Sequence, residues 1–210
     1  MPKVLIVFYS RDGSTEALAG AVAEGAAEAG ADVRLRRLRE LVDERTMAAV
    51  PGWRESAERM NAIYEAPSPD DMTWADAIIF GSPTRFGLLA AELKAFLDSL
   101  GGLWFQGKLA GKVGSAFTSS SSVHGGNEIC NFTMFAPMAH FGMIIVPPGY
   151  TDPVMFKAGT PYGASSVSQG ANRAPPSGED RAVARHQGKR VAGIAKALAL
   201  PDSRAGSIGT

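Results

Sequence analysis

Short apolar runs alternate with longer amphipathic segments along most of this 210-residue chain. Five apolar runs have the length of strands that are buried on both faces of a sheet, and they span residues 4–8, 33–38, 77–80, 113–117 and 143–146. Strands that are separated by helices pair in parallel through right-handed crossovers. The pattern therefore predicts an α/β fold with a five-stranded, doubly wound parallel sheet and helices on both faces.

Three amphipathic segments predict the clearest helices. The first has Ser14 as its expected N-cap and stops at Gly30. The second spans residues 89–100 and stops before a pair of glycines. The third follows a pair of prolines, and Ser177 and Asp180 have the spacing of a capping box at its start.

Two segments do not fit a minimal five-strand unit. Residues 39–71 mix charges and prolines with a weak helical pattern, so we expect a partly helical excursion between the second and third strands. Residues 147–176 are rich in Gly, Pro, Ser and Ala, and the run G-T-P-Y-G-A-S-S at residues 159–166 favours an ordered loop there. We expect one domain over residues 1–200 and a disordered tail over residues 201–210.

Charge and cysteine content exclude several kinds of partner. The 21 basic residues balance 21 acidic ones, so no overall field favours nucleic acid or an anionic membrane. The first apolar run is too short for a signal segment or a membrane span, so we expect a cytoplasmic protein. Cys130 is the single cysteine, and we expect it to be an inert core residue. The histidines show no ligand spacing, so we expect no metal site.

A polar turn follows the first predicted strand and leads into a helix. It contains Ser10, Arg11, Asp12, Gly13, Ser14 and Thr15. Unpaired amides and the positive end of the helix dipole favour an anion at such a place. The turn has neither the lysine of a triphosphate loop nor the three glycines of a dinucleotide fingerprint, so it fits one phosphate. Serine and glycine also serve capping and turning at such positions, and the turn alone does not separate the two interpretations.

The turn after the third predicted strand contains Gly81, Ser82, Pro83, Thr84, Arg85, Phe86 and Gly87. The amides of Thr84, Arg85 and Phe86 are expected to donate hydrogen bonds to a planar heterocycle, and Gly87 permits a close approach. The Arg85 side chain is expected to offset charge on a reduced ring, although a surface arginine on a turn is the default in isolation.

The turn after the fourth predicted strand contains Thr118, Ser119, Ser120, Ser121, Ser122, Val123, His124, Gly125 and Gly126. Its composition is that of a flexible linker, but its position directly after a central strand favours backbone contact with a ligand edge. Ligands of doubly wound sheets bind beyond the carboxyl ends of the strands. The three turns together therefore predict one ligand site at that edge.

Six segments carry a resemblance to a known family. They are K-V-L-I-V-F-Y-S at residues 3–10, I-I-F-G-S-P-T-R-F-G at 78–87, F-L-D-S-L-G-G-L-W at 96–104, A-H-F-G-M-I-I-V-P-P-G-Y at 139–150, G-T-P-Y-G-A at 159–164 and A-R-H-Q-G at 184–188. Together they resemble the tetrameric, flavodoxin-like NAD(P)H:quinone oxidoreductases named after the tryptophan-repressor-binding protein WrbA. The resemblance implies strand order 2-1-3-4-5, FMN as cofactor, NADH or NADPH as electron donor, quinones as acceptors and a homotetramer built as a dimer of dimers.

The resemblance also implies roles for single residues. Residues 10–15 hold the FMN phosphate, residues 84–86 hold the flavin ring, and residues 119–124 hold the ribityl chain and ring edge. His140 lies beside the flavin of a neighbouring subunit, and Trp104 packs over the substrate position. Without the resemblance, His140 would be interpreted as a core histidine and Trp104 as a core or interface anchor.

Two features bear on the electron donor and on subunit contacts. The family often has an aromatic residue at the position of Asp12, where it contacts the nicotinamide cofactor, so the choice between NADH and NADPH stays open. The segment 132–143 is apolar around more than one helical face, which favours a subunit interface.

The implied reaction passes hydride from NAD(P)H to FMN and then two electrons to a quinone on the same face of the ring, which predicts ping-pong kinetics. A flavodoxin-type electron carrier is one alternative, although carriers of that type usually have an acidic docking face and the charge here is balanced. An FMN-binding regulatory scaffold without NAD(P)H turnover is another. Steady oxidation of NADH in the presence of benzoquinone separates the three.

Overall fold

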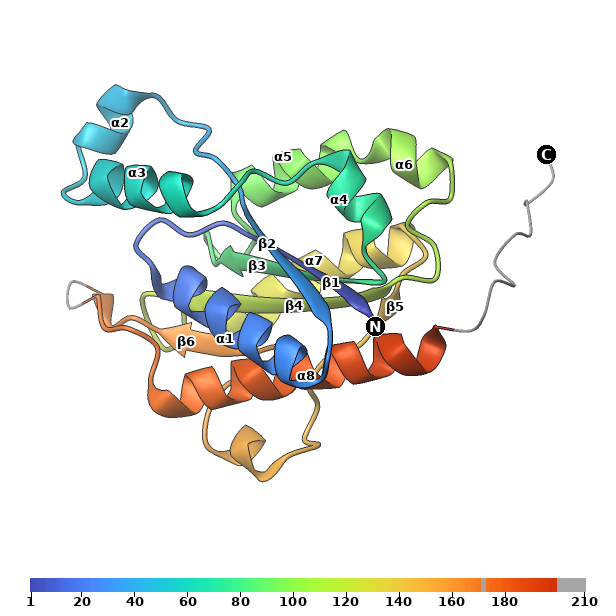
Figure 1. Cartoon of the computed structure of the whole chain (residues 1–210). Coiled ribbons are helices and arrows are strands. Elements are labelled where there is room, and N and C mark those ends of the chain that lie inside the picture. Colours follow the sequence, from blue (N-terminus) through green and yellow to red (C-terminus); the bar gives the residue numbers. More distant parts are fainter. Residues whose placement is uncertain (171–172, 200–210) are drawn as a thin grey trace.

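A parallel sheet forms the centre of the molecule (Figure 1). The structure is a computed structural model that describes residues 1–170 and 173–199, so the predicted disordered tail lies outside the described residues. Five strands follow the predicted order β2-β1-β3-β4-β5: β1 (Lys3–Phe8), β2 (Asp32–Arg37), β3 (Ala77–Pro83), β4 (Val113–Ser120) and β5 (Ile144–Ile145). A further short strand, β6 (Ser165–Val167), pairs in parallel with the end of β4.

Helices cover both faces of the sheet, as predicted (Figure 1). One face is covered by α1 (Ser14–Glu28) and α8 (Gly178–Leu198), and the other by α4 (Pro69–Trp74), α5 (Ala91–Ser99), α6 (Gly101–Phe105) and α7 (Asn127–His140). The predicted excursion over residues 39–71 is partly helical, with α2 (Glu44–Ala48) and α3 (Trp53–Ile63) as well as the start of α4. The loop over residues 147–176 is ordered where the structure describes it and contains a 3-10 helix, η1 (Pro153–Phe156), before β6.

The central strand β1 divides the core into two layers because successive side chains point to opposite faces of a sheet. Val4, Ile6 and Phe8 pack with α1 and α8, whereas Leu5 and Val7 pack with the helices of the other face. All five side chains are fully buried, as the apolar run predicts. Strand β2 was also predicted to be buried on both faces, and this was wrong, because β2 is an edge strand with β1 as its only neighbour in the described sheet.

Two glycines let α1 and α8 pack backbone to backbone. A Cβ atom at Gly25 would lie 1.9 Å from the carbonyl oxygen of Arg185, and one at Gly188 would lie 2.0 Å from that of Val22. The capping box of Ser177 and Asp180 is present at the start of α8, as predicted.

Strands β3 and β4 are longer than predicted, and this changes where the site begins. They were expected to end at Phe80 and Phe117, with the following residues in turns. Instead the ladder continues to the pair Pro83 and Ser119, and β6 pairs with β4 on its other side. Gly81 pairs with Phe117 in this ladder, and a Cβ atom at Gly81 would lie 2.1 Å from the Phe117 ring, so the position requires glycine. The first residues of two predicted turns are therefore rigid sheet.

Candidate FMN site at the carboxyl edge of the sheet

The three predicted turns meet at the carboxyl edge of the sheet. The hydroxyl groups of Thr15 and Ser119 are 2.8 Å apart and hydrogen-bonded, which joins the first turn to the third. The Thr84 amide donates to the Ser119 carbonyl at 2.8 Å, and the Thr84 hydroxyl donates to the Gly125 carbonyl at 2.9 Å. The turns are so close that a Cβ atom at Gly126 would lie 2.9 Å from the Cα atom of Gly87.

A small polar cavity of about 100 Å³ lies between the turns at the start of α1. It is lined by Ser10, Arg11, Asp12, Ser14, Thr15, Pro83, Thr84, Arg85, Ser119, Ser120, Ser121 and Ser168. The first intrahelical hydrogen bond of α1 runs from the Ala17 amide to the Gly13 carbonyl. The amides of Ser14 and Thr15 therefore have no acceptor within the helix. Hydroxyl groups and helix-start amides around a space of this size fit a phosphate group.

The prediction that Ser14 caps α1 was wrong. Gly13 is the N-cap, and Ser14 is the first helical residue. The left-handed φ of 95° at Gly13 would be strained for any residue with a side chain. The Ser10 hydroxyl accepts a hydrogen bond from the Gly13 amide at 3.1 Å. The hydroxyl that Ser14 would have used as a cap therefore lines the cavity instead.

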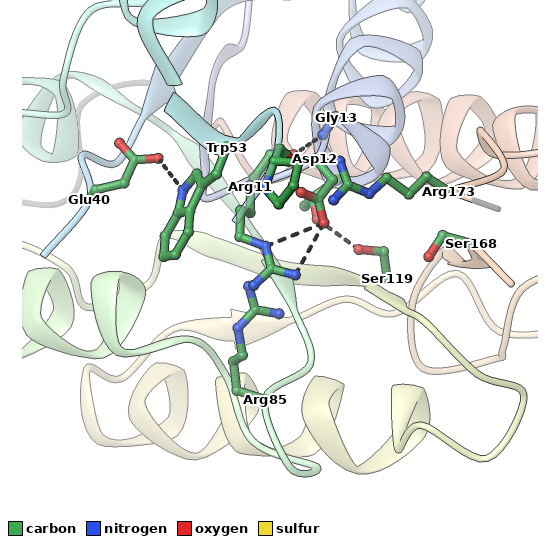
Figure 2. A network of polar contacts seen from close by, with 12 residues as sticks. Arg11, Asp12, Gly13, Glu40, Trp53, Arg85, Ser119, Ser168 and Arg173 are labelled. Atoms are coloured by element: carbon green, nitrogen blue, oxygen red, sulfur yellow. Dashed lines mark hydrogen bonds and ion pairs between the residues drawn. The ribbon is translucent and has the colours of Figure 1, made fainter. Parts of the chain in front are cut away.

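Charge at the mouth of the cavity is positive on balance. Arg11 forms an ion pair with Asp12 at 3.3 Å and lies over the Trp53 ring, 5.3 Å from its centroid. Arg85 donates to the Thr84 carbonyl at 3.2 Å. Figure 2 shows the guanidinium groups of Arg11 and Arg85 pointing toward each other across this mouth. Two guanidinium groups beside one carboxylate favour an anionic group between them.

A wider open groove of about 640 Å³ continues from the cavity. It is lined by Arg11, Thr84, Arg85, Phe86, Gly87, Ser121, His124, Gly125, Gly126 and Ile129, four of which also line the cavity. Phe86 is fully exposed and has a φ of 54°, which is a strained backbone for a residue with a side chain. A planar, partly apolar ring would fit this groove with an attached phosphate in the cavity, so the residues present fit FMN.

The expected hydrogen bonds from the second turn to the ring are only partly available. The Thr84 amide donates to Ser119, and the Arg85 amide donates to the Leu88 carbonyl at 2.8 Å. The expectation that both donate to a heterocycle was therefore wrong, because they close the turn and join it to β4. Of the three amides, that of Phe86 has no acceptor within the described chain.

The third turn divides into a buried and an exposed part. Ser119 and Ser120 are buried within β4, whereas residues 121–124 are exposed. The Ser122 carbonyl accepts from the Ser120 hydroxyl at 2.7 Å and from the Gly125 amide at 3.0 Å, so Ser122 shapes the turn without lining the cavity or the groove. Val123 also lines neither of them.

Trp104 and His140 lie outside the cavity and the groove of their own chain. Helix α7, with Gly126 as its N-cap, begins beside the site and runs away from it, and a helix of its length spans about 20 Å. His140 is the last residue of that helix, and its carbonyl accepts a hydrogen bond from the Trp104 indole at 2.9 Å. The two residues therefore form one exposed unit at the opposite end of α7.

The structure adds site residues that the sequence did not reveal. Ser168 lines the cavity because its amide donates to the Ser120 carbonyl at 2.8 Å, which depends on the pairing of β6 with β4. Trp53 reaches Arg11 from the excursion between β2 and β3. Figure 2 shows Arg173 beside Asp12, and its guanidinium donates to the carbonyl of Pro51, between α2 and α3, at 3.1 Å. None of the three follows from a local motif.

Two further properties concern the described residues as a whole. Cys130 is fully buried, as predicted, and burial raises the pKa of its thiol. Over residues 1–170 and 173–199, the structure contains no helix that combines the length and the apolar character needed to cross a membrane.

A phosphate-sized polar cavity that opens into a groove at the carboxyl edge of a 2-1-3-4-5 sheet is the arrangement of a flavodoxin-like protein. The sequence matches the family of NADPH-dependent FMN reductases over residues 2–152, and the chain belongs to this family. It is 46% identical over 189 residues to the NAD(P)H dehydrogenase (quinone) of Deinococcus radiodurans, covering 90% of this chain and 92% of that protein. It is 40% identical over 200 residues to the protein of the same name from Archaeoglobus fulgidus, and the match covers 94% of this chain and 100% of that protein.

Solved structures agree with this family. A flavodoxin, WrbA-like protein from Agrobacterium tumefaciens is similar with a TM-score of 0.66 and 26% identity, over 94% of this chain and 99% of that one. An archaeal flavodoxin has a TM-score of 0.59 at 21% identity, over 92% of this chain and 99% of that one, which supports the fold alone. The resemblance to the WrbA-type proteins is thereby confirmed.

Proposed function

We propose that this protein is an FMN-dependent NAD(P)H:quinone oxidoreductase that reduces quinones to hydroquinones by two electrons. The observation that carries the proposal is the convergence of three turns on a phosphate-sized cavity that opens into a ring-sized groove. Relatives at 40–46% identity over almost the whole chain are named NAD(P)H dehydrogenase (quinone), which supports the same activity.

The phosphate of FMN is assigned to the cavity and its ring to the groove. The amides at the start of α1, with the hydroxyl groups of Ser10, Thr15 and Ser119, bind the phosphate. Thr84 and Gly87 hold the second turn against the third, and Arg85 supplies positive charge beside the ring. When bound, FMN supplies the hydride chemistry, which alternates between a nicotinamide donor and a quinone acceptor.

A homotetramer would complete the site. His140 ends α7, and Trp104 of α6 is hydrogen-bonded to its carbonyl oxygen, so both lie too far from the start of α7 to reach the groove of their own chain. This geometry supports their arrival from another copy. Large apolar side chains that are half exposed or more extend from the groove along α7, among them Ile129 and Phe132. An interface would bury them. The tetramer and the cytoplasmic location stay predictions, and light scattering of the purified protein tests the first.

The activity is tested with protein that has been titrated with FMN and then mixed with NADH or NADPH without oxygen. We expect the visible absorbance band of bound, oxidised FMN to be bleached by the donor and restored by benzoquinone. Initial rates at varied donor and quinone should give parallel double-reciprocal lines, because both substrates use one face of the ring. Retention of FMN without reduction by either donor would instead indicate an electron carrier or a scaffold.

A further inference from the structure

A fully buried arginine lies beneath the turn that is assigned to the FMN phosphate. Arg37 is the last residue of β2 and has no exposed surface. A buried charge is costly unless it is paired and hydrogen-bonded. Its guanidinium group forms a two-pronged ion pair with Glu40, with Nη1 to Oε2 at 3.2 Å and Nη2 to Oε1 at 2.5 Å. The Glu40 side chain is itself only 5% exposed.

The two terminal nitrogens of this guanidinium group also reach two separate segments, whereas Nε has no hydrogen-bond partner among the described residues. Nη2 donates to the carbonyl oxygen of Ser10 at 3.0 Å, and Nη1 donates to Oδ1 of Asn61 in α3. Ser10 begins the phosphate turn, and its hydroxyl group holds the Gly13 amide. One buried cation therefore connects the end of β2, the excursion helix α3 and the residue from which the turn starts.

The partner carboxylate extends the network to the next residue of the turn. Oε1 of Glu40 accepts a hydrogen bond from the Trp53 indole at 3.4 Å, and the ring of Trp53 lies under the Arg11 guanidinium. Figure 2 shows Glu40 and Trp53 side by side next to Arg11. Ser10 and Arg11 are thus both contacted by groups that do not line the cavity, namely Arg37 and Trp53.

We propose that Arg37, together with Glu40, is a positioning residue that sets the turn over residues 10–15 in the conformation that binds the FMN phosphate. The proposal rests on the assignment of the phosphate to the cavity beside this turn. The buried pair is neutral as a whole, so it acts through the position of the Ser10 carbonyl and of the Arg11 side chain. Ser10 lines the cavity and not the groove, so the effect falls mainly on the phosphate end of the cofactor.

Riboflavin, which has the ring and ribityl chain of FMN without its phosphate, separates a positioning role from a structural one. Dissociation constants of FMN and riboflavin are measured by quenching of flavin fluorescence for the unaltered protein, Arg37→Lys and Glu40→Gln. Lysine keeps the charge but lacks the planar fork that reaches Glu40, Ser10 and Asn61 together. We expect Arg37→Lys to weaken FMN binding about tenfold or more and to leave riboflavin within about twofold. Glu40→Gln should change the ratio in the same direction.

Arg36→Lys is the matched control on the same strand. Arg36 pairs with Asp71 and Glu65, away from the phosphate turn, so this variant should keep the unaltered ratio of the two constants. If Arg37→Lys does not fold, Trp53→Phe provides the same measurement, since it removes the indole hydrogen bond to Glu40 and keeps the buried ion pair intact.

The possible results separate the two proposals. An unchanged ratio in Arg37→Lys and Glu40→Gln, or an equal loss of FMN and riboflavin, would overturn the positioning role while leaving the phosphate site in place. Equal affinity of the unaltered protein for FMN and riboflavin would overturn the phosphate assignment, and the positioning role with it. A selective loss of FMN binding supports both.

Discussion

Replacing Thr84 with valine tests whether the second and third turns must be tied together for FMN to bind. The Thr84 hydroxyl donates to the Gly125 carbonyl at 2.9 Å and accepts from the Gly87 amide at 3.1 Å. Valine keeps the shape of the side chain but removes both bonds. Each hydrogen bond contributes about 1 kcal/mol, so the ordered conformation of these turns should be about 2 kcal/mol less stable in the variant.

That loss predicts a larger dissociation constant for FMN. About 2 kcal/mol corresponds to a factor of about 30 in affinity if the turns must be ordered for binding. The assay is a titration of FMN fluorescence with each variant at constant pH and salt. Thermal unfolding of the flavin-free proteins, measured in parallel, shows whether the change stays local to the turns.

Thr84→Ser is the matched control because it keeps the hydroxyl group and loses only a methyl group. We expect its FMN affinity to stay within a few-fold of that of the unaltered protein. Equal affinities of Thr84→Val and the unaltered protein would refute the reasoning, since the link between the turns would then not matter. An equal loss in Thr84→Ser would also refute it, because the hydroxyl bonds would not be the cause.

Further predictions concern the ring, the core and the response to pH. Arg85→Ala should lower FMN affinity or turnover with quinone, and unchanged values for both would remove this side chain from the site. Gln187→Leu removes three buried hydrogen bonds that join α8 to β4 and to the residue before β6, so the free energy of unfolding should fall by about 3 kcal/mol in urea titrations. Cys130 should react with a thiol reagent only as fast as the protein unfolds, and rapid labelling of the native protein would contradict its burial. Burial lowers the pKa of His186 below its ordinary 6.5. The contribution of the neutral imidazole to stability is therefore complete above pH 6.5 and is lost as the pH falls below it. The free energy of unfolding of His186→Gln should decline less between pH 7.5 and 5.5 than that of the unaltered protein.

Local sequence patterns were sufficient for the elements whose signals are local. The apolar run of β1 predicts burial on both faces because the strand is central, and the start of α8 follows from the capping box at Ser177 and Asp180. The three turns were predicted because each directly follows a strand of a parallel sheet, where turns share one edge. Their convergence required only the order of the strands.

Features that depend on pairing between distant segments were not predicted. Strand β6 is short and polar, and it forms only because β4 offers a free edge beyond the end of β5. The residues around Arg37 have the composition of an exposed edge strand. Its burial depends on α3 folding back over the end of β2. The cap at the start of α1 was misplaced by one residue because a left-handed glycine and a preceding hydroxyl replaced the usual side-chain cap.

A crystal structure of the protein grown with saturating FMN tests the central claim most directly. The account predicts that the phosphate oxygens lie within hydrogen-bond distance of the Ser14 and Thr15 amides and that the ring lies against Thr84 and Gly87. A phosphate bound away from the start of α1, or a ring outside the groove between the second and third turns, would contradict it.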